Sequence, residues 1–404
     1  MLKQSRQTLV QTARDMLDRL DSNTIQLAPE VTCVDASLYT DNIRFQQEFT
    51  QLFRRVPLML AASCELPEPG DYKALEVAGV PVLLVRGSDG EARAFLNSCT
   101  HRGSQLADGH GKAARFTCPY HGWTFSGNGQ LLGVASQHSY GDVDKEALSL
   151  VRLPLLESSG LIWVVLDPGS ALDIPSFLQG VDGMLAGFDL EHWHFYHQCT
   201  LPGANWKLAF DAHMDFYHLP VLHRNTFGPT ISNLAQYYFH GPHQRLGLMS
   251  TNSVEQDDLR QLRDLPEEEW PTHTLLFGEW ILFPNVSLNH YKLSERVMVI
   301  SQVLPGSTPD SSVTIQTYLT ENRPGPASEP EVDEFVAFIK HVVGEEDLPM
   351  SRKQQAVLSS GLLPKVQFGR NEVGLQNYYA WLEQILAASD SEALNRLFEK
   401  PGPG

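Results

Sequence analysis

The sequence predicts an α+β fold in which a small antiparallel β domain precedes a larger domain of helices packed on one sheet. Short β-rich runs, punctuated by turns, occupy residues 57–167. Four further strand-like runs follow at 280–283, 286–288, 296–300 and 312–319, with helical periodicity before and after them. Helix, sheet and helix in that order indicate helices that cover one sheet. We therefore expect three parts: an N-terminal helical segment over residues 1–56, a β domain over 57–167 and an α+β domain over 168–400.

The individual elements follow from the same patterns. Apolar residues recur at helical spacing in residues 2–21 and again in 42–54, which predicts two N-terminal helices. The β domain contains expected strands at 80–86, 92–96, 115–117 and 161–166, and Asp89-Gly90 forms a hairpin-type turn. Beyond it we expect a strand at 192–199 and helices over 173–187, 205–219, 331–343 and 374–388.

Composition excludes several classes of protein. The 404 residues are 42% hydrophobic and 19% charged, as in an ordinary globular chain. A net charge of −18 disfavours nucleic acid or an anionic membrane as a partner. Five cysteines, an odd number without a regular framework, argue against a disulfide scaffold. The N-terminus lacks an apolar signal core, and no apolar run is long enough to span a bilayer, so we expect a cytoplasmic protein.

Two short segments predict an electron-transfer cluster. Cys99 and His101 are separated by one residue, Cys118 and His121 by two, and sixteen residues lie between the two pairs. Structural zinc sites usually place two to four residues between neighbouring ligands, so a single residue makes convergence on one ion strained. In a Rieske [2Fe–2S] centre each loop sends its cysteine to one iron and its histidine to the other, which suits the short spacer. A zinc knuckle is the alternative.

A second constellation indicates mononuclear iron. On a helix over 205–219, Asp211, Asp215 and His218 share one face. Pro220 bends or ends that helix, so His223 can turn back towards His218. Two histidines and one carboxylate form the facial triad of non-heme Fe(II) oxygenases, which leaves positions open for O2. His213 lies on the other side of this helix and is interpreted as structural.

The carboxylate of the triad must come from elsewhere in the chain. The best candidate is Asp347, near the start of a late helix. Its neighbours Glu345 and Glu346 are expected to be solvated, and either becomes the ligand if the register differs. An acidic helix start that merely favours the helix dipole is the competing interpretation.

With these motifs the chain resembles the large (α) subunit of Rieske non-heme iron ring-hydroxylating oxygenases over residues 40–390. The resemblance implies a Rieske domain inserted near the start of a helix-grip (START-like) catalytic domain. It also implies a trimer in which one subunit's cluster serves the neighbouring subunit's iron, with Asp215 bridging His121 of one subunit and His218 of the next. Asp211 is expected to support the site from behind. Relatives often carry Asn after that position, where this chain has Ala212.

The expected activity is that of a terminal oxygenase. O2 is the co-substrate, and an aromatic or other apolar ring receives one or two hydroxyl groups, as in the catabolism of aromatic hydrocarbons. The alternatives are oxidative demethylation or hydroxylation of a polar small molecule, such as a quaternary ammonium compound, and a non-enzymatic electron carrier. No phosphate-cradling glycine pattern accompanies a βαβ unit. Electrons should therefore come from NAD(P)H through a separate reductase, with or without a ferredoxin. The expected assembly is a homotrimer, with or without a small β subunit.

Overall fold

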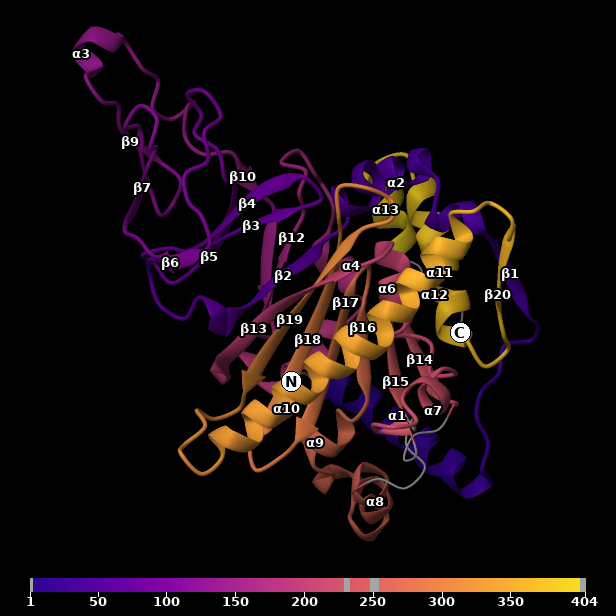
Figure 1. The fold of residues 1–404 in the computed structure, drawn as a ribbon. Helices are drawn as coiled ribbons and strands as arrows, with labels where there is room; N and C mark the ends of the chain where they lie inside the picture. Colours follow the sequence, from indigo (N-terminus) through magenta and orange to yellow (C-terminus); the bar gives the residue numbers. More distant parts are fainter. Residues whose placement is uncertain (1–2, 229–232, 248–253, 400–404) are drawn as a thin grey trace.

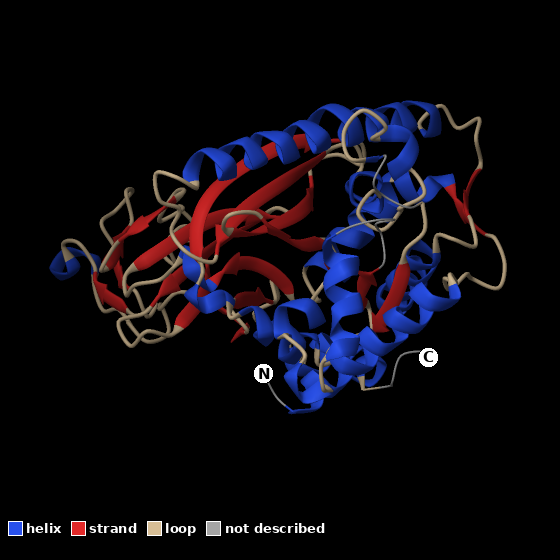
Figure 2. Ribbon diagram, turned by 90° about the horizontal axis from the view of Figure 1, so that it is seen from below, coloured by secondary structure: helices blue, strands red, loops and turns tan. Residues whose placement is uncertain are grey.

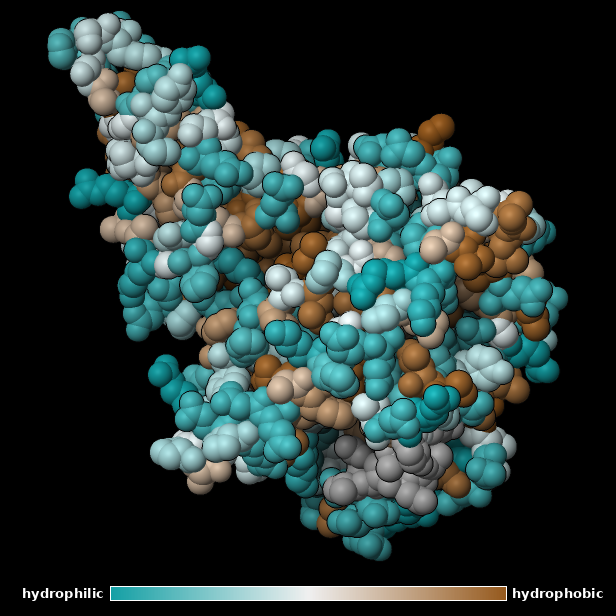
Figure 3. Space-filling view, in the orientation of Figure 1, coloured by the Kyte–Doolittle hydropathy of each residue, from teal (hydrophilic) through white to brown (hydrophobic). Residues whose placement is uncertain are grey.

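The computed structural model describes residues 3–228, 233–247 and 254–399 (Figure 1). Leu2, the first residue of the first expected helix, and residue 400, the end of the third expected part, lie outside the described residues. A small β lobe projects from a larger body, and apolar side chains gather at the junction between them (Figures 1 and 3). No helix within the described ranges is long and apolar enough to cross a membrane.

The body is built on a seven-stranded antiparallel sheet in the order β13-β19-β18-β17-β16-β15-β14. Its strands are β13 (His194–Gly203), β14 (Gln236–His240), β15 (His243–Gly247), β16 (Glu279–Leu282), β17 (Val286–Lys292), β18 (Arg296–Pro305) and β19 (Ser312–Thr320). The strands at 280–283, 286–288, 296–300 and 312–319 predicted from sequence all belong to this sheet. The α+β class is therefore confirmed.

Helices from several stretches of the chain surround this sheet. The long helix α10 (Glu329–His341) lies across the strands (Figures 1 and 2). Val332 and Val336 on its inner face share an apolar cluster with Val297, Val299 and Tyr318. A π-helical turn, η9 (Val342–Asp347), then leads directly into α11 (Leu348–Leu358). The remaining helices of the body are α4 (Ile174–Leu178), α5 (Val181–Leu185), α6 (Trp206–Asp211), α7 (Leu219–Leu222), α8 (Val254–Gln261), α9 (Thr272–Leu275), α12 (Val373–Ala387) and α13 (Ser391–Phe398).

The small lobe has an apolar core of its own, made of residues such as Leu83, Phe95, Phe116 and Phe125. One five-stranded sheet joins β10-β5-β4-β3-β6, and a three-stranded sheet joins β7-β8-β9. Their strands are β3 (Asp71–Val77), β4 (Val80–Arg86), β5 (Ala92–Leu96), β6 (His110–Lys112), β7 (Arg115–Thr117), β8 (Thr124–Ser126), β9 (Leu131–Gly133) and β10 (Arg152–Leu153), with the short helix α3 (Gln137–Tyr140). A further sheet, β11-β12-β2, links lobe and body through β2 (Leu58–Ala62), β11 (Leu155–Ser158) and β12 (Leu161–Val164).

The N-terminal segment packs on the body. It comprises α1 (Lys3–Ser22), β1 (Thr32–Asp35), α2 (Asn42–Gln47) and the π-helical turn η2 (Glu48–Phe53). Strand β1 pairs with β20 (Lys365–Phe368) near the other end of the chain. The carboxylate of Glu48 is fully buried, where Lys207 Nζ and Trp206 Nε1 donate hydrogen bonds to it. This contact ties η2 to α6.

Three expected elements differ from the structure. The helix predicted over 205–219 ends at Asp211, and Pro220 stands in the first turn of a new helix, α7, where a missing N–H costs nothing. Asp211, Asp215 and His218 therefore do not share one helix face. The helix predicted over 173–187 is split into α4 and α5, because Gln179 and Gly180 adopt left-handed backbone angles. The strand expected from residue 192 begins at His194, after a 3₁₀ turn.

Candidate active site

The two cysteine loops have matching conformations. In each loop the cysteine carbonyl accepts a hydrogen bond from a glycine N–H four residues later: Gly103 to Cys99 (2.9 Å) and Gly122 to Cys118 (3.0 Å). Both glycines have positive φ, of 80° and 70°, which a residue with a Cβ rarely adopts. The cysteine N–H in turn donates to the carbonyl five residues on. Two equivalent loops therefore present two thiols and two imidazoles to a shared space.

The donor set of these loops fits a Rieske cluster. Cys99 and Cys118 are buried, and the imidazoles of His101 and His121 lie 4.8 Å apart between ring centroids. Nδ1 of each imidazole is buried and has no hydrogen-bond partner among the described residues. Orphaned buried nitrogens are costly unless a metal ligates them. Two thiols beside two such nitrogens make the Cys2His2 set that holds [2Fe–2S] in a Rieske centre.

The environment of the thiols also favours a cluster. Burial raises the pKa of Cys99. Burial also opposes the thiolate of Cys118, but main-chain N–H groups of His121 and Tyr120 donate to its sulfur, and its pKa is lowered overall. N–H groups directed at cluster sulfurs stabilise negative charge there and tune the reduction potential. Trp123 stacks on the His101 ring, with centroids 4.8 Å apart and planes within 7°. This contact fixes the orientation of the ring.

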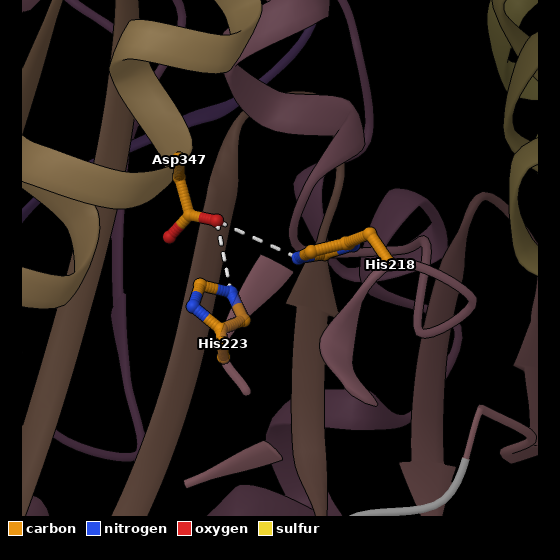
Figure 4. A group of neighbouring side chains, drawn as sticks. All are labelled: His218, His223 and Asp347. Carbon is orange, nitrogen blue, oxygen red and sulfur yellow. Dashed lines mark ion pairs between the residues drawn. The ribbon is translucent and has the colours of Figure 1, made fainter. Parts of the chain in front are cut away.

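The structure brings His218, His223 and Asp347 together, with one ligand atom of each within 4.8 Å of the others. His223 Nε2 lies 3.1 Å and His218 Nε2 3.5 Å from the same oxygen, Asp347 Oδ1 (Figure 4). Atoms bound to one ion at about 2.1 Å and at right angles lie ~3.0 Å apart, so these spacings suit a shared metal. The three residues come from the ends of α7 and from the last residue of η9.

The remaining nitrogen of each histidine faces another carboxylate. His223 Nδ1 lies 2.5 Å from Glu346 Oε2, and His218 Nδ1 lies 3.4 Å from Asp215 Oδ2. A carboxylate on the outer nitrogen sets the tautomer and the ring orientation of a metal-binding histidine. Asp215 is held in turn by the Tyr217 N–H, which donates to Oδ1 at 2.7 Å. Both imidazoles therefore present Nε2 to the metal position.

Charge coupling within this group is strong. Burial opposes the charged form of His218, but Asp215 and Asp347 outweigh it and raise the pKa of His218 to about 9. Burial acts the same way on His223, and Asp347 with Glu346 raises its pKa. Burial pushes the pKa of Asp347 up, yet the two imidazoles lower it overall. Such clustering of shifted groups is typical of a functional site, and a divalent cation would satisfy the same carboxylate.

Asp211 lies near the site, but its side-chain hydrogen bonds are made with residues outside the His218, His223 and Asp347 group. Its carboxylate accepts hydrogen bonds from the hydroxyls of Tyr39 (2.8 Å) and Tyr379 (2.8 Å). Burial raises the pKa of Asp211 to about 7. These contacts connect the end of α6 to the N-terminal segment and to α12. They position the chain that leads to Asp215.

A cavity of about 340 Å3 opens beside His218, His223 and Asp347. Its lining combines aromatic and aliphatic side chains with several polar ones: Phe216, Phe227, Phe277, Tyr291, Val299, Ile339, His213, Glu279, Ser287, Asn289, His290, Ser301 and Gln316. His213, interpreted from sequence as structural, lies in this lining. Its Nδ1 is 3.4 Å from Glu279 Oε1. Because the chain leaves the helix at Asp211, helical spacing does not set the direction of His213, and its structural role stays a prediction.

Two carboxylates have contacts that the residue pattern does not predict. Glu346, expected to be solvated, contacts His223 because the π-helical turn changes the spacing between neighbouring side chains. Glu345 is exposed, as expected. The sequence indicates Glu279 only weakly, as one acidic residue at a strand start beside the apolar run Trp280-Ile-Leu-Phe283. A lone charge next to a buried strand is expensive without a partner or a ligand.

The two candidate metal positions lie far apart within one chain. One cysteine loop follows β5 and the other joins β7 to β8 in the projecting lobe, whereas His218 and His223 stand at the two ends of α7, on the far side of the body (Figure 1). The view from below shows the lobe at one end of the molecule and most helices of the body at the other (Figure 2). Direct electron transfer between them inside one subunit is therefore disfavoured by the geometry.

Comparison with known families matches both parts of the chain. Residues 56–149 match the Rieske [2Fe-2S] domain, and residues 190–388 match the ring hydroxylating alpha subunit catalytic domain. The cysteine loops fall inside the first match. His218, His223 and Asp347 fall inside the second.

Individual relatives point to the same class of protein. The chain is 29% identical over 299 residues to the carnitine monooxygenase oxygenase subunit of Escherichia coli K12, covering 72% of this chain and 74% of that one. Its fold is similar to a quaternary ammonium Rieske monooxygenase, CntA, in complex with substrate gamma-butyrobetaine (TM-score 0.74, 23% identity, 88% of this chain and 96% of that one). It is also similar to naphthalene 1,2-dioxygenase from Rhodococcus sp. bound to indole (TM-score 0.72, 22% identity, 96% and 99%).

Proposed function

Because this chain belongs to the Rieske non-heme iron oxygenases as a large (α) subunit, and is therefore a terminal oxygenase, we propose that it oxidises a small polar molecule by hydroxylation or oxidative demethylation. The observation that carries the proposal is the cavity beside His218, His223 and Asp347, which is lined by polar side chains as well as aromatic ones. A hydrocarbon would leave these polar groups dehydrated and unpaired. The relatives with carnitine as substrate support the same class.

We assign the residue roles accordingly. Cys99, His101, Cys118 and His121 hold the [2Fe–2S] cluster in the part of the chain over 57–167, and His218, His223 and Asp347 hold Fe(II) in the part over 168–400. The bound iron supplies O2 activation, with electrons passed on from the cluster. The chain's own residues fix the two imidazoles through Asp215 and Glu346, and the three ligands would hold the iron beside the cavity.

Electron delivery requires partners. Rieske oxygenases work with a separate reductase and form multimers, and for this chain we propose an NAD(P)H-dependent reductase and a homotrimer. The distance between lobe and α7 within one chain supports delivery from a neighbouring subunit (Figure 1). Asp215 would then bridge His218 and the partner subunit's cluster, since its carboxylate already lies beside His218 Nδ1.

An aromatic or other apolar ring, the substrate preferred from sequence alone, is the second candidate. Phe216, Phe227 and Phe277 in the cavity favour it. The two candidates differ in the polarity of the molecule and in the product.

A substrate screen decides between them. Reduced protein with a nonspecific reductase, NADH and O2 is offered quaternary ammonium compounds and aromatic compounds in parallel. We expect a polar nitrogen compound to gain one oxygen or lose a methyl group as formaldehyde, read by mass spectrometry. Turnover of aromatic compounds alone, with two oxygens added, would contradict the proposal.

A further inference from the structure

A single carboxylate outside the His218, His223 and Asp347 group lines the cavity among the described residues: that of Glu279. Glu279 begins β16, directly after Gly278, and is only 5% exposed. Gly278 has a φ of 113° and its backbone lies against the carbonyl of Leu246, so this bend tolerates no side chain. The strand start thus places the carboxylate at the cavity wall.

The partners of this carboxylate occupy only one of its oxygens. The Ser287 hydroxyl donates to Oε1, and His213 Nδ1 lies 3.4 Å from the same oxygen. Within the described residues no hydrogen bond ends on Oε2. The nearby buried cation, Arg245, is engaged elsewhere, because it donates to the Phe277 carbonyl and packs over Trp280. Arg245 is paired with Trp280 on the neighbouring strand, and Glu279 is paired with Leu246. Because paired residues share a face and successive residues alternate, Arg245 and Glu279 point to opposite faces of the sheet.

The surroundings of Glu279 suit a positively charged ligand. Buried carboxylates are stable only when paired or well hydrogen-bonded, and expulsion of water by a neutral substrate would leave Oε2 unpaired. Aromatic side chains, including those of Phe216 and Phe277, line the same cavity, and aromatic rings attract quaternary ammonium groups. The carboxylate and the aromatic rings together form a binding site for a cation beside the metal position.

We propose that Glu279 is the substrate-binding residue that selects a cationic nitrogen, so that the substrate of this oxygenase is an ammonium compound. The inference rests on the proposed function and narrows its substrate class. Glu279 would hold the cation through Oε2, while Ser287 and His213 fix Oε1. The aromatic side chains would cover the N-alkyl groups.

Binding to a matched pair of ligands tests this directly. Choline and 3,3-dimethyl-1-butanol have the same shape and differ by one positive charge. Calorimetric titration of the purified holoprotein should give choline at least about tenfold tighter binding than the neutral alcohol. The Glu279→Gln variant keeps the shape and the acceptor for Ser287, and should lose that preference while cluster absorbance and iron content stay unchanged.

The control removes an equal charge outside the cavity. Glu321 pairs with Arg296 and does not line the cavity, so Glu321→Gln should keep the choline preference within about threefold. If Glu279→Gln does not fold, Glu279→Asp replaces it, and a shortened carboxylate should retain part of the preference.

Three results would overturn the inference: no choline binding, equal binding of both ligands to the wild type, or an unchanged preference in Glu279→Gln. None of these touches the proposed function, which fails separately if the substrate screen yields no oxygenated or demethylated polar product.

Discussion

Each histidine of the proposed iron site uses its two ring nitrogens for different partners. Nε2 of both faces Asp347, while Nδ1 of His223 faces Glu346 and Nδ1 of His218 faces Asp215. Since the outer partner sets the tautomer, the carboxylates decide which nitrogen can bind metal. The residue spacing of the chain predicts the histidines, but the outer partners depend on turns that no spacing rule describes.

Asp215 gives the first prediction at this scale. Asp215→Ala should lower turnover about 10–100-fold or more, because His218 loses its orienting partner and the proposed bridge to the neighbouring cluster. Cluster absorbance should be unchanged. Asp257→Ala, which removes an exposed carboxylate, is the control and should turn over normally. Full turnover by Asp215→Ala with an intact cluster would refute the bridging role.

Asp211 gives a prediction about pH. Its pKa is raised from 3.8 to about 7 by burial, so the folded state binds the proton more tightly than the unfolded state does. Raising the pH between these values therefore lowers the free energy of unfolding, by an amount on the order of 1–3 kcal/mol. Asp211→Asn cannot titrate, so its stability relative to the wild type should increase from pH 5 to pH 8.

Urea unfolding followed by circular dichroism at both pH values measures that difference. Asparagine retains an acceptor for Tyr39 and Tyr379, so the comparison isolates the charge. A difference that is constant with pH would show that Asp211 carries no shifted proton.

At the scale of elements, the buried pair of Lys207 and Glu48 joins α6 to η2. Both side chains are fully buried, with Nζ 2.7 Å and 2.6 Å from the carboxylate oxygens. Lys207→Met should cost about 1.5–3 kcal/mol, since it removes charge-assisted hydrogen bonds to a buried carboxylate that keeps Arg44 as its second cation. The measurement is the free energy of unfolding in urea.

An exposed pair provides the control for that prediction. Arg396 and Glu392 form an ion pair one helical turn apart on α13, and Arg396→Ala should cost no more than about 0.5 kcal/mol. A loss below about 1 kcal/mol in Lys207→Met would mean that the pair does not stabilise this junction.

The elements also explain what the sequence could predict. Strands such as β4 and β5 and the helix α12 have strong periodicity and are confirmed within one or two residues. The segment after Asp211 contains helix-forming residue types but does not form one continuous helix. Pro220 starts a new helical turn, and two tyrosines bind Asp211 at the end of α6. Helical spacing does not predict the directions of Glu346 and His213, because they depend on a π-helical turn and on the end of α6, which are set by tertiary contacts.

At the scale of the whole molecule, the projecting lobe separates the cluster loops from α7 (Figure 1). We propose that a neighbouring subunit pairs each cluster with an iron. Cys118→Ser should abolish the cluster and Asp347→Ala the mononuclear iron, and each homomer should be inactive. Equal co-expression of the two should restore about a quarter of the wild-type rate per chain, since one site in four then combines an iron with a neighbouring cluster.

The restored rate is measured as oxygen uptake with the substrate that the screen identifies. Activity of the mixture no higher than that of either variant alone would mean that electrons stay within one chain. The same mixture also distinguishes a multimer from a monomer.

We propose that this chain holds a [2Fe–2S] cluster and a separate iron bound by His218, His223 and Asp347. Iron and acid-labile sulfide analysis of the purified protein tests it most directly, with Asp347→Ala beside the wild type. We predict three irons and two sulfides per wild-type chain, and two irons and two sulfides in the variant. A wild type that contains zinc instead of iron, or a variant that retains the third iron, would contradict the account.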